Sequence, residues 1–416
     1  MPTPSEAFAT RFREIRAAAD AQAEAATQRL PPDLAARVQW CGLSGLSSVR
    51  EPWAALARRA LSPNVFYEPA FALAAAPVFG PNAGAMLIWA DAGKQRLLGL
   101  FPAELADWRG GFAWPITRAW THPYAPYGVP LVDRNEASAT IGLWLDALSA
   151  HPHLPKRVLL PFVPTEGPFA AALAQALAAR GLEAARFGAH RRALLAPASD
   201  ADRPGYLDRA LSAKKRKELA RQRRRLADAG PLATTFATAP QEVAQALADF
   251  MTLEQSGWKG RRGTAAAQEA AVAAFMRDAV KGLAATGQVQ IARLAVGGRA
   301  IAAGILLRSG AAGWFWKIAY DERAARVSPG VQLAVDLTRA ALADRTLAQV
   351  DSCATAGHPM IEPLWTERLA LADQLIVLRG AATPVRLAET LRRRTRETAR
   401  ALARRLRVSH RGAAAS

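Results

Sequence analysis

The stretch QVQIARLAVGGRAIAAGILLRSG, residues 288–310, decides the fold, and WFWKIAY follows it at residues 314–320. Two runs rich in valine, isoleucine, leucine and alanine flank Gly297-Gly298, a glycine pair that favours the tight turn of a β-hairpin. The third apolar run predicts a strand beside that hairpin. A polar turn at 321–330, a helix at 331–343 and a short strand at 347–350 follow. This order predicts an α/β fold built on a mixed sheet.

The turn before the predicted helix carries Arg323, Arg326, Ser328, Pro329 and Gly330. A helix N-terminus presents unpaired backbone N–H groups and a partial positive charge, so it can hold a phosphate or another anion. The turn therefore predicts a phosphate site. The alternative interpretation is an ordinary capped helix, with Ser328 as the N-cap and Pro329 at the first helical position.

Composition excludes several classes of protein. The chain has 416 residues, of which 51% are hydrophobic, and a net charge of +19. No apolar run reaches the roughly 18 uncharged residues that a membrane span needs, and the N-terminus lacks the apolar core of a secretory signal. Cys41 and Cys353 cannot form a disulfide framework, and no Cys/His cluster has zinc spacing, so no metal is expected. We therefore expect a cytoplasmic protein.

The order of elements repeats along the chain. The corresponding pairs are the hairpins at 86–101 and 289–307, the helices at 137–148 and 331–343, and the strands at 157–163 and 347–351. The offset drifts only from about 203 to about 190 residues, so the sequence predicts an internal duplication. The first copy has Tyr127-Gly128-Val129-Pro130 in place of the basic turn. We therefore expect the second copy to hold the chemistry.

Two segments carry most of the positive charge. Residues 207–228 have a net charge of +6 and residues 384–416 a net charge of +8. The first predicts a helix that is either solvated with one buried leucine face or in contact with phosphates of a nucleotide, a tRNA or an anionic lipid. It has no aromatic residue interleaved to stack on bases, which argues against a nucleic-acid or tRNA binder. Among nucleic acids, tRNA stays open only as the donor of a Fem-like transferase.

The C-terminal segment has leucines at helical spacing among its arginines, at positions 387, 391, 402 and 406. This pattern is typical of a basic amphipathic helix on an anionic membrane surface, such as the inner membrane, or on a partner complex. A solvated helix is the alternative.

Four motifs together resemble a known family: EQSGWKGRRGT at 254–264, KIAYD at 317–321, SPG at 328–330, and Asp351. They are similar to the GNAT-like acetyltransferases associated with cellulose and other polysaccharide biosynthesis, often called CelD-like. That family is similar to the Fem-type peptidyltransferases, which carry two tandem GNAT-like domains. The resemblance is strongest over about residues 205–355. It implies that acetyl-CoA or another acyl-CoA lies between splayed strands, with its pyrophosphate on the turn at Arg323, Arg326, Ser328 and Gly330.

Acyl transfer to an amine or hydroxyl needs a polarised donor carbonyl, a base for the acceptor and an acid for the leaving group. Asp351 is the first candidate base because it follows an apolar strand, where burial can make a carboxylate more basic; Glu254 is the second. Tyr320 is the candidate acid, and Lys317 is placed to hold an anionic substrate or stabilise the oxyanion. The predicted substrate contacts are Trp258, Lys259 and Trp316. For each of these residues the alternative is a packing, surface or ion-pair role.

We therefore expect a GNAT-type acyltransferase with a small-molecule or saccharide acceptor, linked to cellulose, exopolysaccharide or envelope biosynthesis. The alternatives are a non-catalytic accessory protein of a polysaccharide synthase and a Fem-like transferase that uses aminoacyl-tRNA. Gly330 is the single glycine of the turn, which leaves room for the tRNA donor. The predicted segments are a helical extension (1–36), a degenerate GNAT-like domain (37–200), a basic linking helix (201–232), a GNAT-like acyltransferase domain (233–380) and a basic amphipathic tail (381–416).

Overall fold

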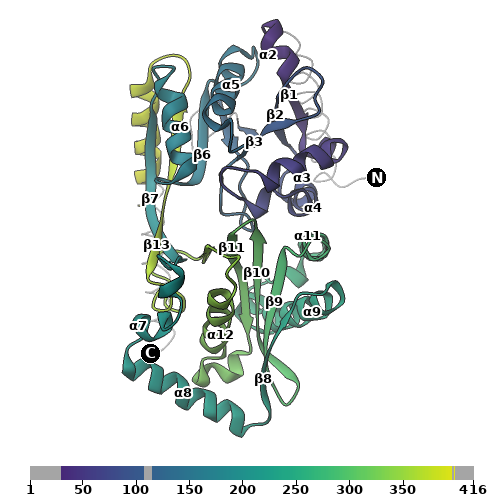
Figure 1. The fold of residues 1–416 in the computed structure, drawn as a ribbon, viewed down its shortest axis with the longest axis vertical. Helices are drawn as coiled ribbons and strands as arrows, with labels where there is room; N and C mark the ends of the chain where they lie inside the picture. The colour runs from purple at the N-terminus through teal and green to yellow at the C-terminus, as the bar shows by residue number, and fades with distance from the viewer. Residues whose placement is uncertain (1–29, 107–114, 396–397, 399–416) are drawn as a thin grey trace.

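The computed structural model describes residues 30–106, 115–395 and 398. Its strands form one mixed sheet in the order β1-β2-β3-β4-β6-β13-β7-β12-β11-β10-β9-β8, with β5 paired to β3. Figure 1 shows two units, one above the other, with β7 and β13 running along the side of both. None of the helices in these ranges is long and apolar enough to cross a membrane.

The first unit has five strands in antiparallel pairs and a sixth, β6, parallel to β4. Its strands are β1 (Val38–Gly42), β2 (Ala83–Trp89), β3 (Leu97–Ala106), β4 (Ile116–Ala119), β5 (Leu131–Val132) and β6 (Arg157–Pro164). Its helices are α2 (Pro32–Arg37), α3 (Arg50–Arg58), α4 (Pro69–Phe79), α5 (Ala137–Ala150) and α6 (Pro168–Ala178), with short 3-10 helices η1 (Leu43–Val49) and η2 (Val65–Tyr67).

The second unit repeats this plan, with β12 parallel to β11. Its strands are β8 (Leu232–Ala237), β9 (Val289–Val296), β10 (Arg299–Ser309), β11 (Ala312–Tyr320) and β12 (Gln349–Asp351). Its helices are α9 (Pro240–Ser256), α10 (Trp258–Arg261), α11 (Ala270–Ala284) and α12 (Pro329–Ala343), with 3-10 helices η4 (Ala266–Gln268) and η5 (Glu322–Val327). Each pair of elements expected from the duplication is present in both units.

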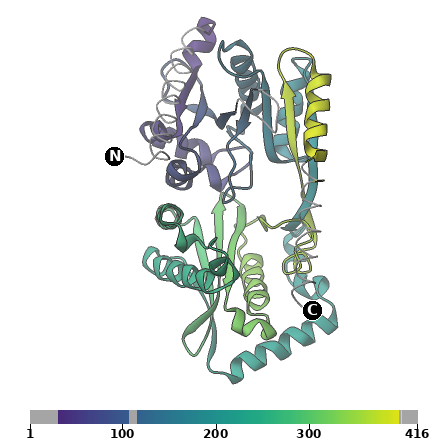
Figure 2. The same cartoon turned by 180° about the vertical axis from the view of Figure 1, so that it is seen from behind.

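The apolar pattern of each segment sets the layers of the second unit. The hairpin glycines Gly297 and Gly298 have φ of 55° and 79°, the left-handed values that the β9–β10 turn requires. Helices α9 and α11 pack with one apolar face of the sheet, and α12 packs with the other. Figure 2 shows these helices on the two sides of the sheet. The sheet of the second unit is therefore covered on both faces.

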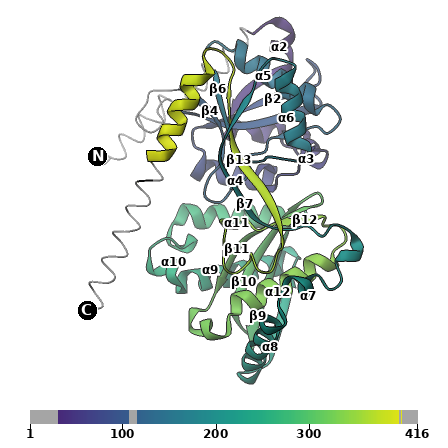
Figure 3. The same cartoon turned by 90° about the vertical axis from the view of Figure 1, so that its left-hand side faces the viewer.

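The two units exchange their last strands. Strand β7 (Ala184–Leu195) follows the first unit in sequence but pairs with β12, whereas β13 (Glu367–Val377) follows the second unit and pairs with β6. The two exchanged strands also pair with each other along most of their length (Figure 3). A sequence boundary near residue 200 therefore does not separate two independent sheets.

Other expectations from the sequence need correction. Strands β8 and β13 were not expected, because neither has a clean alternation of apolar and polar residues. The linking helix is broken at Leu211 into α7 (Tyr206–Ala210) and α8 (Ala213–Asp228), where Ser212 caps α8 by accepting from the Lys215 amide. Trp258 begins a short helical turn, α10.

The terminal segments are only partly covered by the described ranges. Of the predicted N-terminal helix, residues 1–29 lie outside them, as do Leu402 and Leu406 of the predicted tail. Residues 382–395 are helical. This helix is drawn in yellow beside the first unit in Figure 3.

Candidate functional site

The turn before α12 balances part of its own charge. The Asp321 carboxylate accepts hydrogen bonds from the Arg323 guanidinium at 2.8 Å and from Arg299 at 2.9 Å, and also from the Arg323 backbone amide. The Arg323 charge is therefore partly neutralised inside the turn. Arg326 is exposed and forms no ion pair with any residue of the described ranges. Of the two arginines predicted to bind an anion, Arg326 is the one left available.

Ser328 joins η5 to α12 in a left-handed conformation, with φ 51° and ψ 54°. Ser328 occupies the N-cap position, as the alternative interpretation expects, but its side chain makes no capping hydrogen bond. A left-handed residue after a right-handed turn makes successive N–H groups converge, which favours an anion. Pro329 occupies the first helical position, as expected. The Tyr320 ring lies over Gly330, where an added Cβ would lie 3.1 Å from it.

The whole of the short strand β12 pairs with the first residues of β11. The last paired residues are Trp314 and Asp351, where β12 ends, and from there β11 continues to Tyr320 paired with β10. A bulge at this point of β11 shifts its register against β10, and a bulge can turn two successive side chains to the same side of a sheet. Both Trp316 and Lys317 contact Tyr124: the Trp316 indole donates to the Tyr124 carbonyl at 2.7 Å. These two predicted residues therefore lie on the part of β11 that extends beyond the end of β12.

Lys317 is the most perturbed cation of this region. Its Nζ lies 3.9 Å from the centroid of the Tyr124 ring, a cation–π contact. Burial, and then the nearby charge of Lys259, lower the pKa of Lys317 to about 8, against the opposing effect of Glu254. Lys317 therefore changes charge close to neutral pH.

Glu254 lies close to Lys317, but each of its carboxylate oxygens already has a partner. Its Oε1 is paired with Lys259, and its Oε2 accepts from the Ala266 amide at 2.9 Å. Trp258 is 48% exposed and stacks with Arg262, whose guanidinium carbon lies 5.0 Å from the ring centroid. The structure brings together four of the predicted residues around a cavity of about 40 Å³: Glu254, Trp258, Lys259 and Tyr320.

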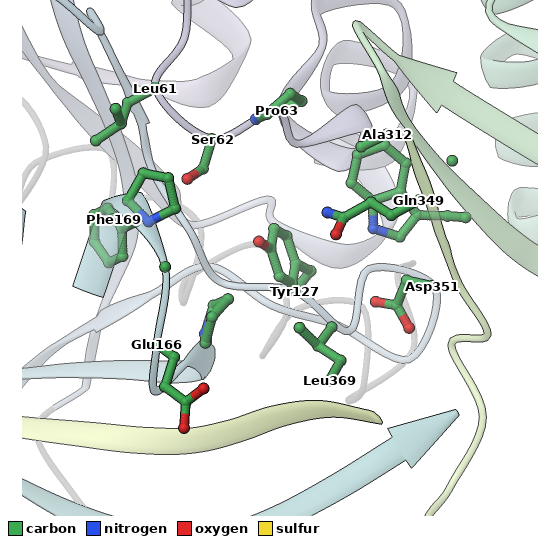
Figure 4. Close-up of a pocket in the computed structure, with 15 residues that line it drawn as sticks. Leu61, Ser62, Pro63, Tyr127, Glu166, Phe169, Ala312, Gln349, Asp351 and Leu369 are labelled. Carbon is green, nitrogen blue, oxygen red and sulfur yellow. The ribbon is translucent and has the colours of Figure 1, made fainter. Parts of the chain in front are cut away.

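Asp351 lies in a different place, between the two units. It is buried, its Oδ2 forms an ion pair with Arg192 of β7, and its Oδ1 accepts from the Cys353 amide at 3.0 Å. Burial, reinforced by the charge of Asp351, raises the pKa of the Cys353 thiol, so this thiol stays protonated. Asp351 lines a cavity of about 210 Å³ that both units build, shown in Figure 4. The two candidate bases therefore do not share one cavity.

Sequence reasoning missed several residues of this region. Arg192 lies on a strand whose pairing with β12 depends on the strand exchange, and a single sequence carries no signal for it. Tyr124 and Tyr127 lie in the segment between β4 and β5, whose contacts with the second unit are not evident from the sequence. Within the described ranges, no group of three or more histidine, cysteine, aspartate or glutamate residues is placed to hold a metal ion.

Comparisons with known proteins agree with this arrangement. Residues 213–357 match the family described as the acetyltransferase (GNAT) domain. This segment holds η5, α12 and β12, and it ends just beyond Asp351 and Cys353. Among curated proteins nothing matches the chain.

Two solved structures share the fold over most of the chain. One is the C-terminal domain of a putative lysylphosphatidylglycerol synthetase from Agrobacterium fabrum, with 13% identity, a TM-score of 0.50, and coverage of 83% of this chain and 96% of that one. The other is FemX, with 9% identity, a TM-score of 0.50, and coverage of 81% and 97%. The predicted fold, a mixed sheet with two tandem GNAT-like units, is confirmed.

Proposed function

We propose that the protein transfers an acyl group, in the first instance acetyl, from acyl-CoA to an amine or hydroxyl acceptor. The observation that carries this proposal is the agreement of two independent features in one segment. Residues 213–357 match the GNAT acetyltransferase domain. The same segment contains strand β11, which extends beyond the end of β12 at Asp351, and a turn with an exposed Arg326 that leads into α12.

The donor would be held by the backbone of that turn. The Gly330 and Val331 amides belong to the first turn of α12, where N–H groups have no acceptor within the helix. Together with Arg326 they favour the pyrophosphate of CoA. Helix α8 packs against η5 and brings further lysine and arginine residues to this side of the unit. Bound CoA supplies a thioester, whose thiolate leaves more readily than an alkoxide.

We assign each step of the transfer to a different side chain. The acceptor gives its proton to the Asp351 carboxylate, which Arg192 holds in one orientation. The acceptor nitrogen or oxygen then bonds to the thioester carbon, and the Lys317 ammonium stabilises the oxyanion. The C–S bond breaks, and the thiolate takes a proton, for which Tyr320 is the candidate donor. Glu254 orients Lys259 and balances the charge near Lys317.

Calorimetric titration of the full chain with acetyl-CoA tests this proposal. We expect micromolar binding, and an Arg326→Ala variant should bind about tenfold more weakly because it loses a charge-assisted contact. Arg134→Ala is the matched control, since Arg134 is an exposed arginine before the corresponding helix of the first unit. Absence of binding to the wild type would overturn the acyl-CoA donor. A Fem-like aminoacyl-tRNA donor or a non-catalytic accessory role would then become the leading hypothesis.

The biological setting is part of the proposal only through sequence resemblance. The motifs at 254–264 and 317–321 resemble acetyltransferases of cellulose and polysaccharide biosynthesis, and the two solved structures share the fold alone. A saccharide acceptor and a place in envelope biosynthesis therefore remain predictions. Acylation of purified saccharides by the protein with acetyl-CoA would support them.

A further inference from the structure

The Lys317 ammonium of the second unit has an aromatic ring, and not a carboxylate, as its partner. Its Nζ forms no hydrogen bond or ion pair with any residue that the structure describes. It lies 3.9 Å from the centroid of the Tyr124 ring and 5.9 Å from that of the Trp316 ring. The closer of the two rings therefore comes from the first unit.

Packing holds the Tyr124 ring in one orientation. Its centroid lies 5.3 Å from that of Phe79, 5.5 Å from that of Phe275 and 6.0 Å from that of Trp316, the last two in edge-to-face contacts. The backbone on either side of the ring is also held. The Tyr124 carbonyl accepts from the Trp316 indole at 2.7 Å, and its amide donates to Nδ1 of His122 at 3.4 Å. The ring face that meets the ammonium is thus fixed by both units.

The titratable groups around Lys317 supply no free negative charge. Glu254 of α9 is paired with Lys259 of α10. Burial, followed by the charge of Asp351, raises the pKa of the Cys353 thiol, which therefore stays protonated. Burial and then the charge of Lys317 lower the pKa of His122 to about 3, so the imidazole is neutral at ordinary pH. The face of the Tyr124 ring is the group that remains to attract the ammonium.

A ring and a carboxylate affect a buried ammonium differently. Both favour the charged form, because the face of an aromatic ring carries partial negative charge. A carboxylate also neutralises the cation and accepts one of its three N–H groups. Burial lowers the pKa of Lys317 to about 8, and the Tyr124 ring opposes that effect without cancelling the charge. The contact therefore leaves a cation whose N–H groups remain available to another acceptor.

We propose that Tyr124 is a positioning residue, whose ring face holds the Lys317 ammonium in place and stabilises its charge while leaving its N–H groups free for the oxyanion of the acyl transfer. The part played in the transfer rests on the function proposed above, whereas the hold on the ammonium does not. The first unit then controls the charge of a side chain on β11 of the second unit.

Two rings of similar shape and opposite electrostatics test the hold on the ammonium. Tyr124→Phe keeps the negative ring face, whereas pentafluorophenylalanine incorporated at position 124 removes the attraction at nearly the same size. The pKa of Lys317 is measured in the full chain by NMR titration with isotope-labelled lysine, and the Lys317→Arg variant identifies the signal. We expect a pKa about one unit lower with the fluorinated ring than with phenylalanine. Equal pKa values in the two proteins would overturn the proposal.

The same pair of proteins tests the part played in the transfer. With acetyl-CoA as donor and glucosamine as probe acceptor, kcat at pH 7.5 should be about threefold lower with the fluorinated ring, because fewer ammonium groups are protonated. At pH 6 the two proteins should have equal kcat, and KM for acetyl-CoA should be the same at both pH values. A deficit of equal size at pH 6 would assign the ring a structural role only and overturn the proposal.

A buried ring elsewhere in the first unit provides the control. Phe101 stacks on Trp144 with centroids 4.5 Å apart. Pentafluorophenylalanine at position 101 should leave the pKa of Lys317 unchanged, and an equal shift in both fluorinated proteins would contradict a direct contact. If the wild type binds no acetyl-CoA in calorimetry, the proposed function fails, and the comparison of Lys317 pKa values still decides whether Tyr124 holds the ammonium.

Discussion

The two units share their order of elements, but the turns before their central helices differ in how their charged side chains are paired. In the first unit, the segment before α5 contains Asp133 and Glu136, and Asp133 is buried in ion pairs with Arg59 and Arg96. In the second unit the segment before α12 leaves Arg326 exposed. The Arg134 side chain of the first turn donates to the Arg58 and Arg59 carbonyls, whereas Arg326 has no ion pair within the described ranges. The two turns therefore offer an anion different surroundings.

The segment of the first unit that contains Tyr124 and Tyr127 packs against β11 of the second unit. Tyr124 accepts from the Trp316 indole and lies under the Lys317 ammonium, and the Tyr127 ring meets Trp314. Close packing holds this loop in place, because a Cβ on Gly128 would lie 2.1 Å from the Pro161 carbonyl oxygen. The first unit thus contributes contacts to Trp314, Trp316 and Lys317 of the second unit.

The largest expected effect comes from breaking the contact that joins the units. Arg192→Ala leaves the Asp351 carboxylate buried without its partner, which should lower the free energy of unfolding by about 3–5 kcal/mol. Urea denaturation measures this loss. Replacing both residues by leucine should recover much of it, because an apolar pair removes the buried charge. Arg345→Ala, which breaks an exposed pair with Asp200, should cost about 1 kcal/mol or less. Equal losses for the two alanine variants would contradict a coupling through the exchanged strand.

Adding one carboxylate to each turn tests which of the two contacts the donor. Ser328→Asp places a carboxylate in the basic turn, and aspartate tolerates the left-handed backbone there. We expect acetyl-CoA to bind at least tenfold more weakly, about 1.4 kcal/mol in binding free energy. Asn135→Asp makes the same change in the first unit and should leave binding unaltered. Similar losses in both variants would show that both turns, or neither, contact the donor.

The pH dependence of kcat tests the role of Lys317. Its charge is lost as pH rises through about 8, so kcat should fall above that pH if the ammonium stabilises the oxyanion. Lys317→Arg, which stays charged, should keep kcat level across the same range, whereas an unchanged decline would point to another group.

As pH rises, the contribution of Lys317 to the free energy of unfolding should increase, whereas kcat should fall. The folded pKa of Lys317 lies below its ordinary value of 10.5, so between pH 8 and 10.5 the unfolded chain binds more protons. The contribution of Lys317 to the free energy of unfolding therefore rises with pH in that window. Urea midpoints of the wild type and Lys317→Met at pH 7 and pH 10 measure it, and the advantage of the methionine variant should shrink at pH 10.

The sequence predicts most of what is local. The glycine pair, the apolar runs and the Pro329 helix start depend on neighbouring residues, and the structure has them. The exchange of β7 and β13 depends on pairing between residues nearly 200 positions apart, as in Arg192 with Leu369, and periodicity carries no such information. Asp351 was identified from its position after a strand. The partner that orients it, Arg192, and the cavity that both units build beside it follow only from that exchange.

The smallest expected effect on stability concerns the two basic helices. Helix α8 buries its leucines 219 and 226, whereas the C-terminal helix buries Val385, Glu389 and Arg392 and leaves Leu387 and Leu391 exposed by 68% and 57%. We propose that these two leucines, flanked by arginines, contact an anionic membrane surface. Changing both to glutamine should alter the free energy of unfolding by less than about 0.5 kcal/mol, because the side chains are exposed.

The same double variant should bind at least tenfold more weakly to vesicles containing anionic phospholipid in a sedimentation assay, because two apolar side chains no longer enter the interface. Lys214→Gln with Lys217→Gln is the matched control on α8, where both side chains are exposed. If the α8 variant loses vesicle binding and the leucine variant keeps it, the charge beside the second unit and not the C-terminal helix makes the contact. Acetyl-CoA titration of both variants then separates membrane docking from donor binding, since the C-terminal helix lies beside the first unit (Figure 3).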